Sequence, residues 1–153
     1  PADQVYSVRD GKIFITGQPF GYMYTKEKYS DYKLHVEWRW PNGDSNANSG
    51  IFLHIADLKN PFPNGIECNL QAGRAGLFVL LGGSDLVEYQ QRPGEERPFF
   101  PVVKNIFVKD GVITVYINGV YQNTGTNKVK EGHIGLQSEG KEVEFRNVTL
   151  TKW

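Results

Sequence analysis

The chain has 153 residues, a length that suits one domain with a buried core, and we expect a single domain over residues 1–153. Its 17 basic and 17 acidic residues cancel, and no basic tract occurs, so the charge pattern of a nucleic-acid binder is absent. The longest apolar run, Leu77 to Leu81, is far shorter than the roughly 20 residues of a membrane-spanning helix. We therefore expect neither a nucleic-acid partner nor a membrane span.

Short alternating runs bounded by Gly, Pro, Asn and Asp follow one another along the chain, and helical periodicity is almost absent. The first two runs, Val5 to Val8 and Lys12 to Ile15, are joined at Asp10-Gly11, a dipeptide that favours the primed turns of β-hairpins. Tyr22 to Tyr24 forms a further short strand. This pattern is typical of an all-β sandwich or jelly roll.

Residues 31–40 alternate strictly between apolar and polar, which predicts a strand with one buried face. The inward set is apolar and consists of Tyr32, Leu34, Val36, Trp38 and Trp40. The outward set is polar and consists of His35, Glu37 and Arg39.

Two later runs show the same alternation. In residues 50–55, Phe52 and His54 lie opposite an inward set of Ile51, Leu53 and Ile55. In residues 66–71, Glu67, Asn69 and Gln71 lie opposite an inward set of Ile66, Cys68 and Leu70. Because elements close in sequence often share a sheet, we expect the polar faces of all three strands to form one surface.

The rest of the chain alternates polar loops with strands. The loops 41–48 and 57–64 are expected at the rims, and residues 84–101 form a long loop with poor periodicity. Strands are expected at 102–108 and 112–118, joined at Asp110-Gly111, and Asn118-Gly119 closes the next hairpin. The last strands, 133–137 and 143–148, carry Gln137, Glu144 and Arg146 on their polar faces. The single cysteine allows no internal disulfide.

Several motifs, in this order and over nearly the whole chain, resemble the 3-keto-disaccharide hydrolase family, whose fold is a concanavalin A-like jelly roll. The matching stretches are Asp10-Gly11-Lys12-Ile13, Gly21-Tyr22-Met23-Tyr24-Thr25, Tyr29-Ser30-Asp31-Tyr32-Lys33-Leu34, Glu37-Trp38-Arg39, Asn48-Ser49-Gly50-Ile51, Gly65-Ile66-Glu67, Asn118-Gly119, Gly135-Leu136-Gln137 and Val143-Glu144-Phe145-Arg146-Asn147-Val148. The resemblance implies an extracytoplasmic protein, periplasmic or secreted, that acts on a carbohydrate.

The activity that the resemblance implies is cleavage of glycosides already oxidised to a ketone at C3. The ketone acidifies the proton on C2, and loss of that proton creates an enolate from which the C1 substituent can leave. Such a site needs a base, a cation or metal for the enolate oxygen, and an acid for the departing oxygen. Glu67 or His54 can be the base and Arg39 the enolate stabiliser. Glu37 can orient Arg39 or His54, or act as the acid. Substrate contacts are expected from Asn48, Phe52, Asn69, Gln71, Gln137 and Arg146.

The chain departs from the family pattern at three places, one of which is the region between Leu81 and Val103, where many members carry a longer segment with a Trp-Asn pair. Members usually carry an arginine where this chain has His54, and an acidic residue is common two to four positions beyond Glu67, where it has Asn69 to Gln71. A non-catalytic carbohydrate-binding module on the same fold is therefore the alternative function.

Three other interpretations stay open. Glu37 and Glu67 on neighbouring strands can flank a glycosidic bond, as in a two-carboxylate glycosidase. Those two carboxylates and His54 are suitable ligands for a divalent metal, but they lack short ligand spacing, so no cofactor is expected. Finally, Glu37, Arg39, Glu67 and Arg146 can be cross-strand ion pairs on a solvated sheet surface.

Overall fold

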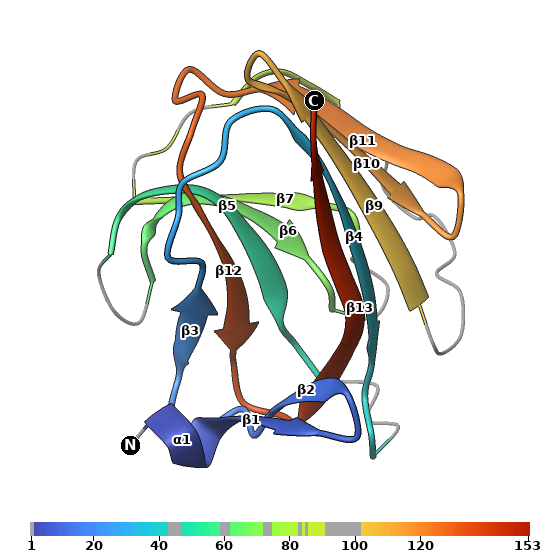
Figure 1. The fold of residues 1–153 in the computed structure, drawn as a ribbon. Coiled ribbons are helices and arrows are strands. Elements are labelled where there is room, and N and C mark those ends of the chain that lie inside the picture. Colours follow the sequence, from blue (N-terminus) through green and yellow to red (C-terminus); the bar gives the residue numbers. More distant parts are fainter. Residues whose placement is uncertain are drawn as a thin grey trace.

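The computed structural model describes residues 2–42, 47–58, 62–71, 75–82, 84, 86–90 and 102–153, and it shows a sandwich of two antiparallel sheets (Figure 1). The eight-stranded sheet, called the large sheet, has the order β1 (Tyr6–Arg9), β2 (Lys12–Ile15), β13 (Val143–Lys152), β4 (Tyr32–Arg39), β9 (Val102–Lys109), β10 (Val112–Ile117), β11 (Val120–Thr126), β8 (Val87–Gln90). The five-stranded sheet, called the small sheet, has the order β3 (Gly21–Tyr24), β12 (His133–Ser138), β5 (Gly50–Asp57), β6 (Asn64–Asn69), β7 (Phe78–Leu81). The predicted jelly-roll class is confirmed.

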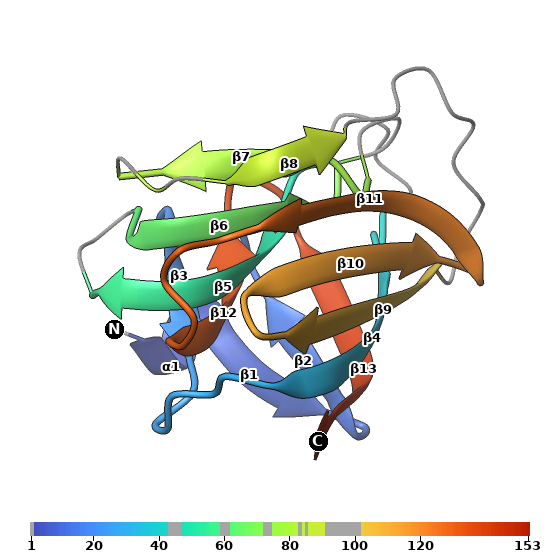
Figure 2. The ribbon, with the colours of Figure 1, turned by 90° about the horizontal axis from the view of Figure 1, so that it is seen from above.

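Three hairpins form at the Asp-Gly and Asn-Gly dipeptides that were predicted to be turns. Asp10-Gly11 joins β1 to β2, Asp110-Gly111 joins β9 to β10, and Asn118-Gly119 joins β10 to β11. All six turn residues have a positive φ, between 48° and 82°, as a type I′ turn requires. Figure 2 shows β9, β10 and β11 running side by side in the large sheet.

The core lies between the two sheets. The large sheet supplies fully buried side chains such as Val36, Ile106 and Val115, and the small sheet supplies Ile51 and Ile66. The alternation predicted for residues 32–38 is confirmed, since Tyr32, Leu34, Val36 and Trp38 are all buried. Cys68 is also fully buried there, and its burial raises the pKa of the thiol to about 12. A thiol with this pKa is inert at neutral pH.

The expectation that residues 31–40, 50–55 and 66–71 share one sheet is wrong. β4 lies in the large sheet between β13 and β9, whereas β5 and β6 are neighbours in the small sheet. Alternation along β4 specifies only that one of its faces is buried. It does not specify which strands pair with its edges, and those partners come from much later in the chain.

Two smaller differences concern the ends of elements. Residues Ala2–Val5 form a short helix, α1, and the first strand begins at Tyr6 rather than Val5. Within the expected loop 84–101, residues Val87–Gln90 form β8 on the edge of the large sheet, paired with β11. The remainder of that loop, residues 91–101, lies outside the described residues, as do residues 43–46 and 59–61 of the two expected rim loops. No helix among the described residues is long and apolar enough to cross a membrane.

A bulge interrupts β5 at His54, whose φ is 55°. The register between β5 and β6 shifts between Leu53 and Asp57, so the alternation changes phase. Ile55 consequently leaves the main core and packs in a second cluster with Tyr22 and Phe52. The expectation that Ile55 shares a face with its neighbour Leu53 is therefore wrong, because a periodic pattern does not reveal an extra residue in a strand.

Gly132 lets the chain pass against this bulge. A Cβ built on Gly132 would lie 2.3 Å from the carbonyl carbon of His54 and 2.5 Å from its Cα. Both are backbone atoms, so the clash cannot be relieved by a change in a side-chain rotamer. We expect Gly132→Ala to lower the free energy of unfolding by about 3 kcal/mol or more, as measured by chemical denaturation.

Gly119→Ala is the matched control for this prediction. A Cβ there would meet nothing within 4 Å, although the φ of +80° still imposes backbone strain. We expect that strain to cost about 1 kcal/mol. Equal losses in the two variants would contradict the close approach between Gly132 and β5.

Candidate functional site

The outer face of the small sheet, called the small-sheet face, gathers polar and aromatic residues from β3, β12, β5 and β6. Residues directly opposite each other in antiparallel strands project to the same side. The register therefore groups three pairs on this face: Phe52 with Glu67, Gly50 with Asn69, and Tyr22 with Gln137. The residues that alternate with them along each strand, including Ile51 and Cys68, point into the core.

Glu67 and Gln137 converge above Gly50. A Cβ built on Gly50 would lie 2.6 Å from Cγ and 2.7 Å from Cδ of Glu67, and 3.1 Å from Oε1 of Gln137. The missing side chain of Gly50 therefore makes the space that the carboxyl and the amide share. Glu67 is 5% exposed and Gln137 is 1% exposed.

The amide of Gln137 has unused hydrogen-bonding capacity. Both amide atoms are buried and neither makes a hydrogen bond of good geometry among the described residues, although the amide also interacts with the Glu139 carboxyl. A buried polar atom without a partner costs about 1–3 kcal/mol, so such atoms call for a functional explanation. The Oδ1 atom of Asn48 is buried without a described partner in the same way. A polar ligand on this face would supply partners for these groups.

The backbone beneath this face is held by side-chain hydrogen bonds. The hydroxyl of Ser49 donates to the carbonyl oxygen of Gln137 at 2.7 Å, which ties the start of β5 to β12. At the end of β6, the backbone N–H of Gln71 donates to Oδ1 of Asn69 at 2.7 Å. These bonds fix the strands that carry Glu67 and Gln137.

Aromatic rings form the other half of the small-sheet face. Tyr22 packs edge-on against Phe52 with ring centroids 5.5 Å apart, and its centroid is 5.8 Å from that of Tyr24. Phe52 is fully buried, so it supports Tyr22 rather than offering a ring to solvent. Tyr24 is 49% exposed.

His54 occupies the position where members of the family that the chain resembles usually carry an arginine. It is 1% exposed, and its ring interacts with the backbone of Val129. Burial lowers the pKa of the imidazole to about 4, so His54 is neutral at pH 7. It therefore provides no positive charge to an enolate at that pH.

The depressed pKa of His54 predicts a pH dependence of stability. In the unfolded chain the imidazole has a pKa near 6.5, so between pH 6.5 and 4 the unfolded state binds the extra proton. The free energy of unfolding should fall as the pH is lowered through this window, by at most about 1.4 kcal/mol per pH unit from this group. Denaturant unfolding at pH 7, 6, 5 and 4.5 measures the slope.

His54→Asn is the variant for this test, because asparagine tolerates a positive φ and does not titrate. We expect the slope below pH 6.5 to become shallower in the variant. Glu139, whose carboxyl pKa is raised by burial, contributes a slope of the opposite sign in both proteins. Identical slopes in the two proteins would contradict a buried, neutral His54.

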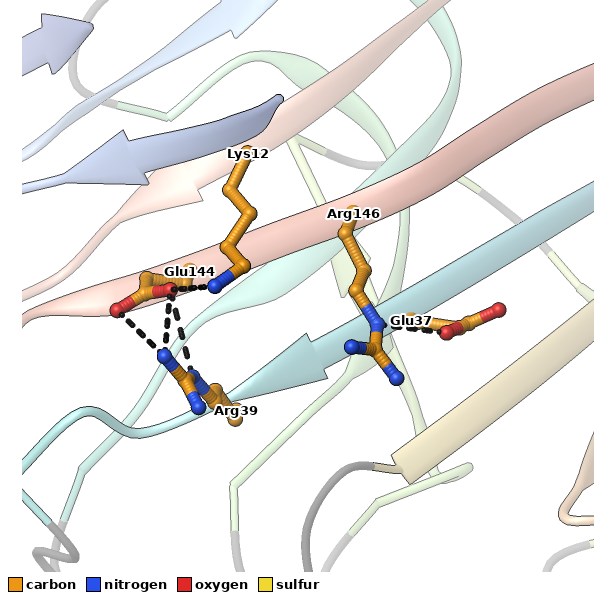
Figure 3. Close-up of polar contacts among 5 residues, drawn as sticks. All are labelled: Lys12, Glu37, Arg39, Glu144 and Arg146. Carbon is orange, nitrogen blue, oxygen red and sulfur yellow. Dashed lines mark hydrogen bonds and ion pairs between the residues drawn. The ribbon is translucent and has the colours of Figure 1, made fainter. Parts of the chain in front are cut away.

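The other predicted site residues lie on the outer face of the large sheet, called the large-sheet face (Figure 3). Nε of Arg146 donates to Oε1 of Glu37 at 2.9 Å, and Nε2 of His35 lies 2.9 Å from Oε2 of Glu37. Asn147 has a φ of 49° at a bulge in β13, and its amide donates to the same carboxylate at 3.2 Å. The bulge lets two consecutive residues of β13 reach one partner.

Arg39 pairs with Glu144 and not with Glu37. Its Nη2 donates to Oε2 of Glu144 at 3.2 Å, and Nζ of Lys12 lies 3.9 Å from the same oxygen.

The pKa of the Glu37 carboxyl is lowered to about 2, chiefly by its hydrogen bond with His35 and next by its hydrogen bond with Arg146. A carboxyl with this pKa stays ionised and is a poor proton donor at neutral pH.

The predicted site residues are thus divided between two faces. Glu67, Asn69 and Gln137 come together on the small-sheet face. Glu37, Arg39 and Arg146 come together on the large-sheet face, on the other side of the core. Over the part of the chain that the structure describes, no three His, Cys, Asp or Glu side chains gather as ligands for a metal ion.

Lys104 is a buried charged residue near the small-sheet face that the sequence interpretation missed. It is fully buried, its Nζ donates to the carbonyl oxygen of Asn69 at 2.9 Å, and it lies 5.6 Å from the ring centroid of Trp38. It reaches across from β9 to the end of β6. The sequence pattern does indicate that Lys104 is buried, because Lys104 falls on the same side of its strand as the core residues Ile106 and Val108.

The chain is similar in structure to several carbohydrate-related proteins. A candidate glycosyl hydrolase from Parabacteroides distasonis ATCC 8503 superposes with a TM-score of 0.72 at 19% identity, over 99% of this chain and 91% of that one. A carbohydrate-binding module from Bacillus subtilis superposes with a TM-score of 0.59 at 16% identity, over 96% and 86%. An alginate lyase of polysaccharide lyase family 7 superposes with a TM-score of 0.62 at 13% identity, over 98% and 83%. At these identities the likeness establishes the fold alone.

The sequence identifies the family. No curated protein matches the sequence of this chain. Residues 1–151, nearly the whole chain, match the 3-keto-alpha-glucoside-1,2-lyase-like domain. The matched range includes the strands that place Glu67 and Gln137 on the small-sheet face. The chain is therefore a carbohydrate-related jelly-roll protein that belongs to the family of 3-keto-alpha-glucoside-1,2-lyase-like domains.

Proposed function

We propose that the protein cleaves 3-keto-glycosides by elimination on the small-sheet face, with Glu67 as the base. The convergence of the Glu67 carboxyl with the Gln137 amide above Gly50 is the observation that carries this proposal. The family match supports the reaction class, because a 1,2-lyase removes a substituent from C1 together with a proton from C2.

The reaction proceeds in two steps whose atoms and charges balance. The carboxylate of Glu67 takes the proton from C2, and the electron pair of that C–H bond moves to the C3 ketone oxygen as an enolate. The enolate then collapses, a double bond forms between C1 and C2, and the C1–oxygen bond breaks. The departing oxygen takes a proton from the Glu67 carboxylic acid or from water, which releases the alcohol and restores the ketone.

The developing enolate requires hydrogen-bond donors, and the small-sheet face offers amides rather than cations. No Lys or Arg side chain projects from the described part of this face. The Nε2 group of Gln137, which makes no hydrogen bond of good geometry among the described residues, is suited to donate to the C3 oxygen. Asn69 lies on the same face beside Glu67 and can donate to a neighbouring hydroxyl. Neutral donors replace the arginine that the sequence led us to expect in Arg39.

A carbohydrate-binding module is the second candidate. The observation that favours it is the state of His54, which is neutral and buried where the family commonly carries a cation. A face with amides and tyrosines but no cation can hold a sugar without breaking it. The two candidates therefore differ in whether Glu67 performs chemistry.

Replacement of Glu67 distinguishes these functions. We expect Glu67→Gln to reduce aglycone release from 3-keto-glucosides at least about a hundredfold, because general-base catalysis contributes about 10²–10⁴-fold. The assay follows aglycone release from a panel of 3-keto-glucosides and their unoxidised parents, with and without divalent metal. Unoxidised parents should release nothing, since their C2 protons are not acidic.

Glu144→Gln is the matched control, since it removes a strand carboxylate from the large-sheet face. We expect its rate to stay within about threefold of the wild type, because Glu144 bonds Arg39 and Lys12 on the far side of the core. Saturable sugar binding without release by the wild type, retained in Glu67→Gln, would favour the binding module. Equal losses in the two variants would contradict a site on the small-sheet face.

Gly50→Ala tests the geometry rather than the base itself. The new Cβ would lie within 2.7 Å of two carbons of Glu67 and would displace the carboxyl. The obstacle is a side chain rather than backbone, so we expect the fold to survive and the rate to fall about a hundredfold. Circular dichroism and the aglycone assay check the two expectations separately. A fully active variant would show that the carboxyl need not lie above Gly50.

A further inference from the structure

The large-sheet face carries an open groove at the end opposite Arg39 and Glu144. Its volume is about 400 Å³, within the range of about 300–1,000 Å³ that is typical of ligand sites. The side chains that line it come from β4, β9, β10 and the residue after β13: Lys33, Asn105, Phe107, Thr114, Tyr116 and Trp153. Cross-strand register places Lys33 opposite Phe107, and Asn105 opposite Tyr116, so these side chains project outward from adjacent strands.

Aromatic rings form the floor of the groove. Phe107 contacts Tyr116 and Trp153 edge-on, with centroid separations of 5.6 Å and 6.2 Å, and Tyr116 continues the row to Tyr121 at 5.9 Å. Trp153 is 59% exposed. Phe107 and Tyr116 are half-buried, and rings held in mutual contact beside the exposed Trp153 are preorganised to receive an apolar surface, such as the C–H face of a pyranose ring.

The charge around the rings is positive. Nζ of Lys33 lies 5.5 Å from the Phe107 centroid, and Nζ of Lys109 lies 5.3 Å from the Trp153 centroid. No carboxylate is among the described residues that line the groove. The nearby Asp110 carboxylate is paired with Lys130 at 2.9 Å and also attracts Lys109, which leaves Lys33 as the lysine that lines the groove.

Polar groups between the rings can fix the orientation of a ligand. Asn105 uses Oδ1 to contact Nδ1 of His35 at 2.9 Å, which leaves its Nδ2 group for the groove. The hydroxyls of Thr114 and Thr124 lie 3.2 Å apart beside it. Amide, hydroxyl and ammonium groups around an aromatic floor match a ligand with apolar ring faces, hydroxyls and a negative charge.

We propose that this groove is a second glycan-binding site, separate from the small-sheet face, and that it binds an oligosaccharide containing uronate residues. A pyranose ring stacks on Trp153 and Tyr116, the uronate carboxylate meets Lys33, and ring hydroxyls bond Asn105 and Thr114. The charge complementarity selects an acidic chain over a neutral one. The two faces lie on opposite sides of the core, so a chain bound here would hold the protein on a polysaccharide without occupying the small-sheet face.

The test is calorimetric titration of the whole protein with a tetrasaccharide of galacturonate and, separately, a neutral tetrasaccharide of glucose. We expect the acidic chain to bind at least about tenfold more tightly than the neutral one. Trp153→Ala and Lys33→Gln should each weaken the acidic chain at least about tenfold. Both residues are exposed, so the variants are expected to fold. Raising the salt concentration should weaken wild-type binding more than binding to Lys33→Gln.

Phe62→Ala and Lys26→Gln are matched controls, since each removes an exposed residue of the same kind outside the groove. Binding should be unchanged in both. The proposal is overturned if the acidic chain does not bind at 10 mM (about the weakest useful affinity), if both chains bind equally, or if the controls weaken binding as much as the groove variants. Sedimentation adds a further check. Self-association that Trp153→Ala abolishes would make this face an interface between copies of the chain, and would likewise overturn the proposal.

Discussion

The structure depends on one constraint, the burial of one face of each sheet against the other. Val36 and Ile106 from the large sheet and Ile51 and Ile66 from the small sheet meet in this single core. Every side chain that alternates away from the core must then lie on one of two surfaces that point in opposite directions. Which residues can cooperate chemically therefore depends on sheet membership and not on their separation in sequence. Glu37 and Glu67 are both strand carboxylates, yet the core lies between them, and this rules out a two-carboxylate site built from that pair.

Local departures from alternation shape both faces. At His54 the bulge moves Ile55 out of the main core to pack with Phe52, which gives the small-sheet face an apolar support beside its polar groups. At Asn147 a second bulge brings two donors of β13 to the carboxylate of Glu37. Bulges re-aim side chains in this way and are common beside functional sites. Two glycines also shape the structure, because the side chain that each lacks leaves room for a close approach. Gly50 leaves room for the Glu67 carboxyl, and Gly132 lets the chain pass against the bulge.

The two faces differ in chemistry in a way that suits different tasks. The carboxyl and amide groups of the small-sheet face are buried, which suits them to act on one sugar ring in the proposed reaction. The large-sheet face is open. Its charges pair across strands around Glu37 and Glu144, and its aromatic rings, of which Trp153 is exposed, lie at the far end around Phe107. An open aromatic surface suits a chain that extends beyond one ring. A carbohydrate protein with both faces can hold a polymer on one side and act on a sugar on the other.

The sequence by itself determined the all-β class, the three type I′ hairpins and the inward set of β4, because these depend on local turn chemistry and on alternation within one strand. It also predicts Glu67 and Gln137 as site residues, and both lie on the small-sheet face. Only the tertiary structure decided that β4 belongs to a different sheet from β5 and β6, since strand pairing is a long-range choice that alternation does not encode. The same holds for the positive φ of His54 and for the burial of Lys104, which reaches across the core to Asn69. Neighbours distant in sequence impose these features, so they become visible only when the two sheets are packed together.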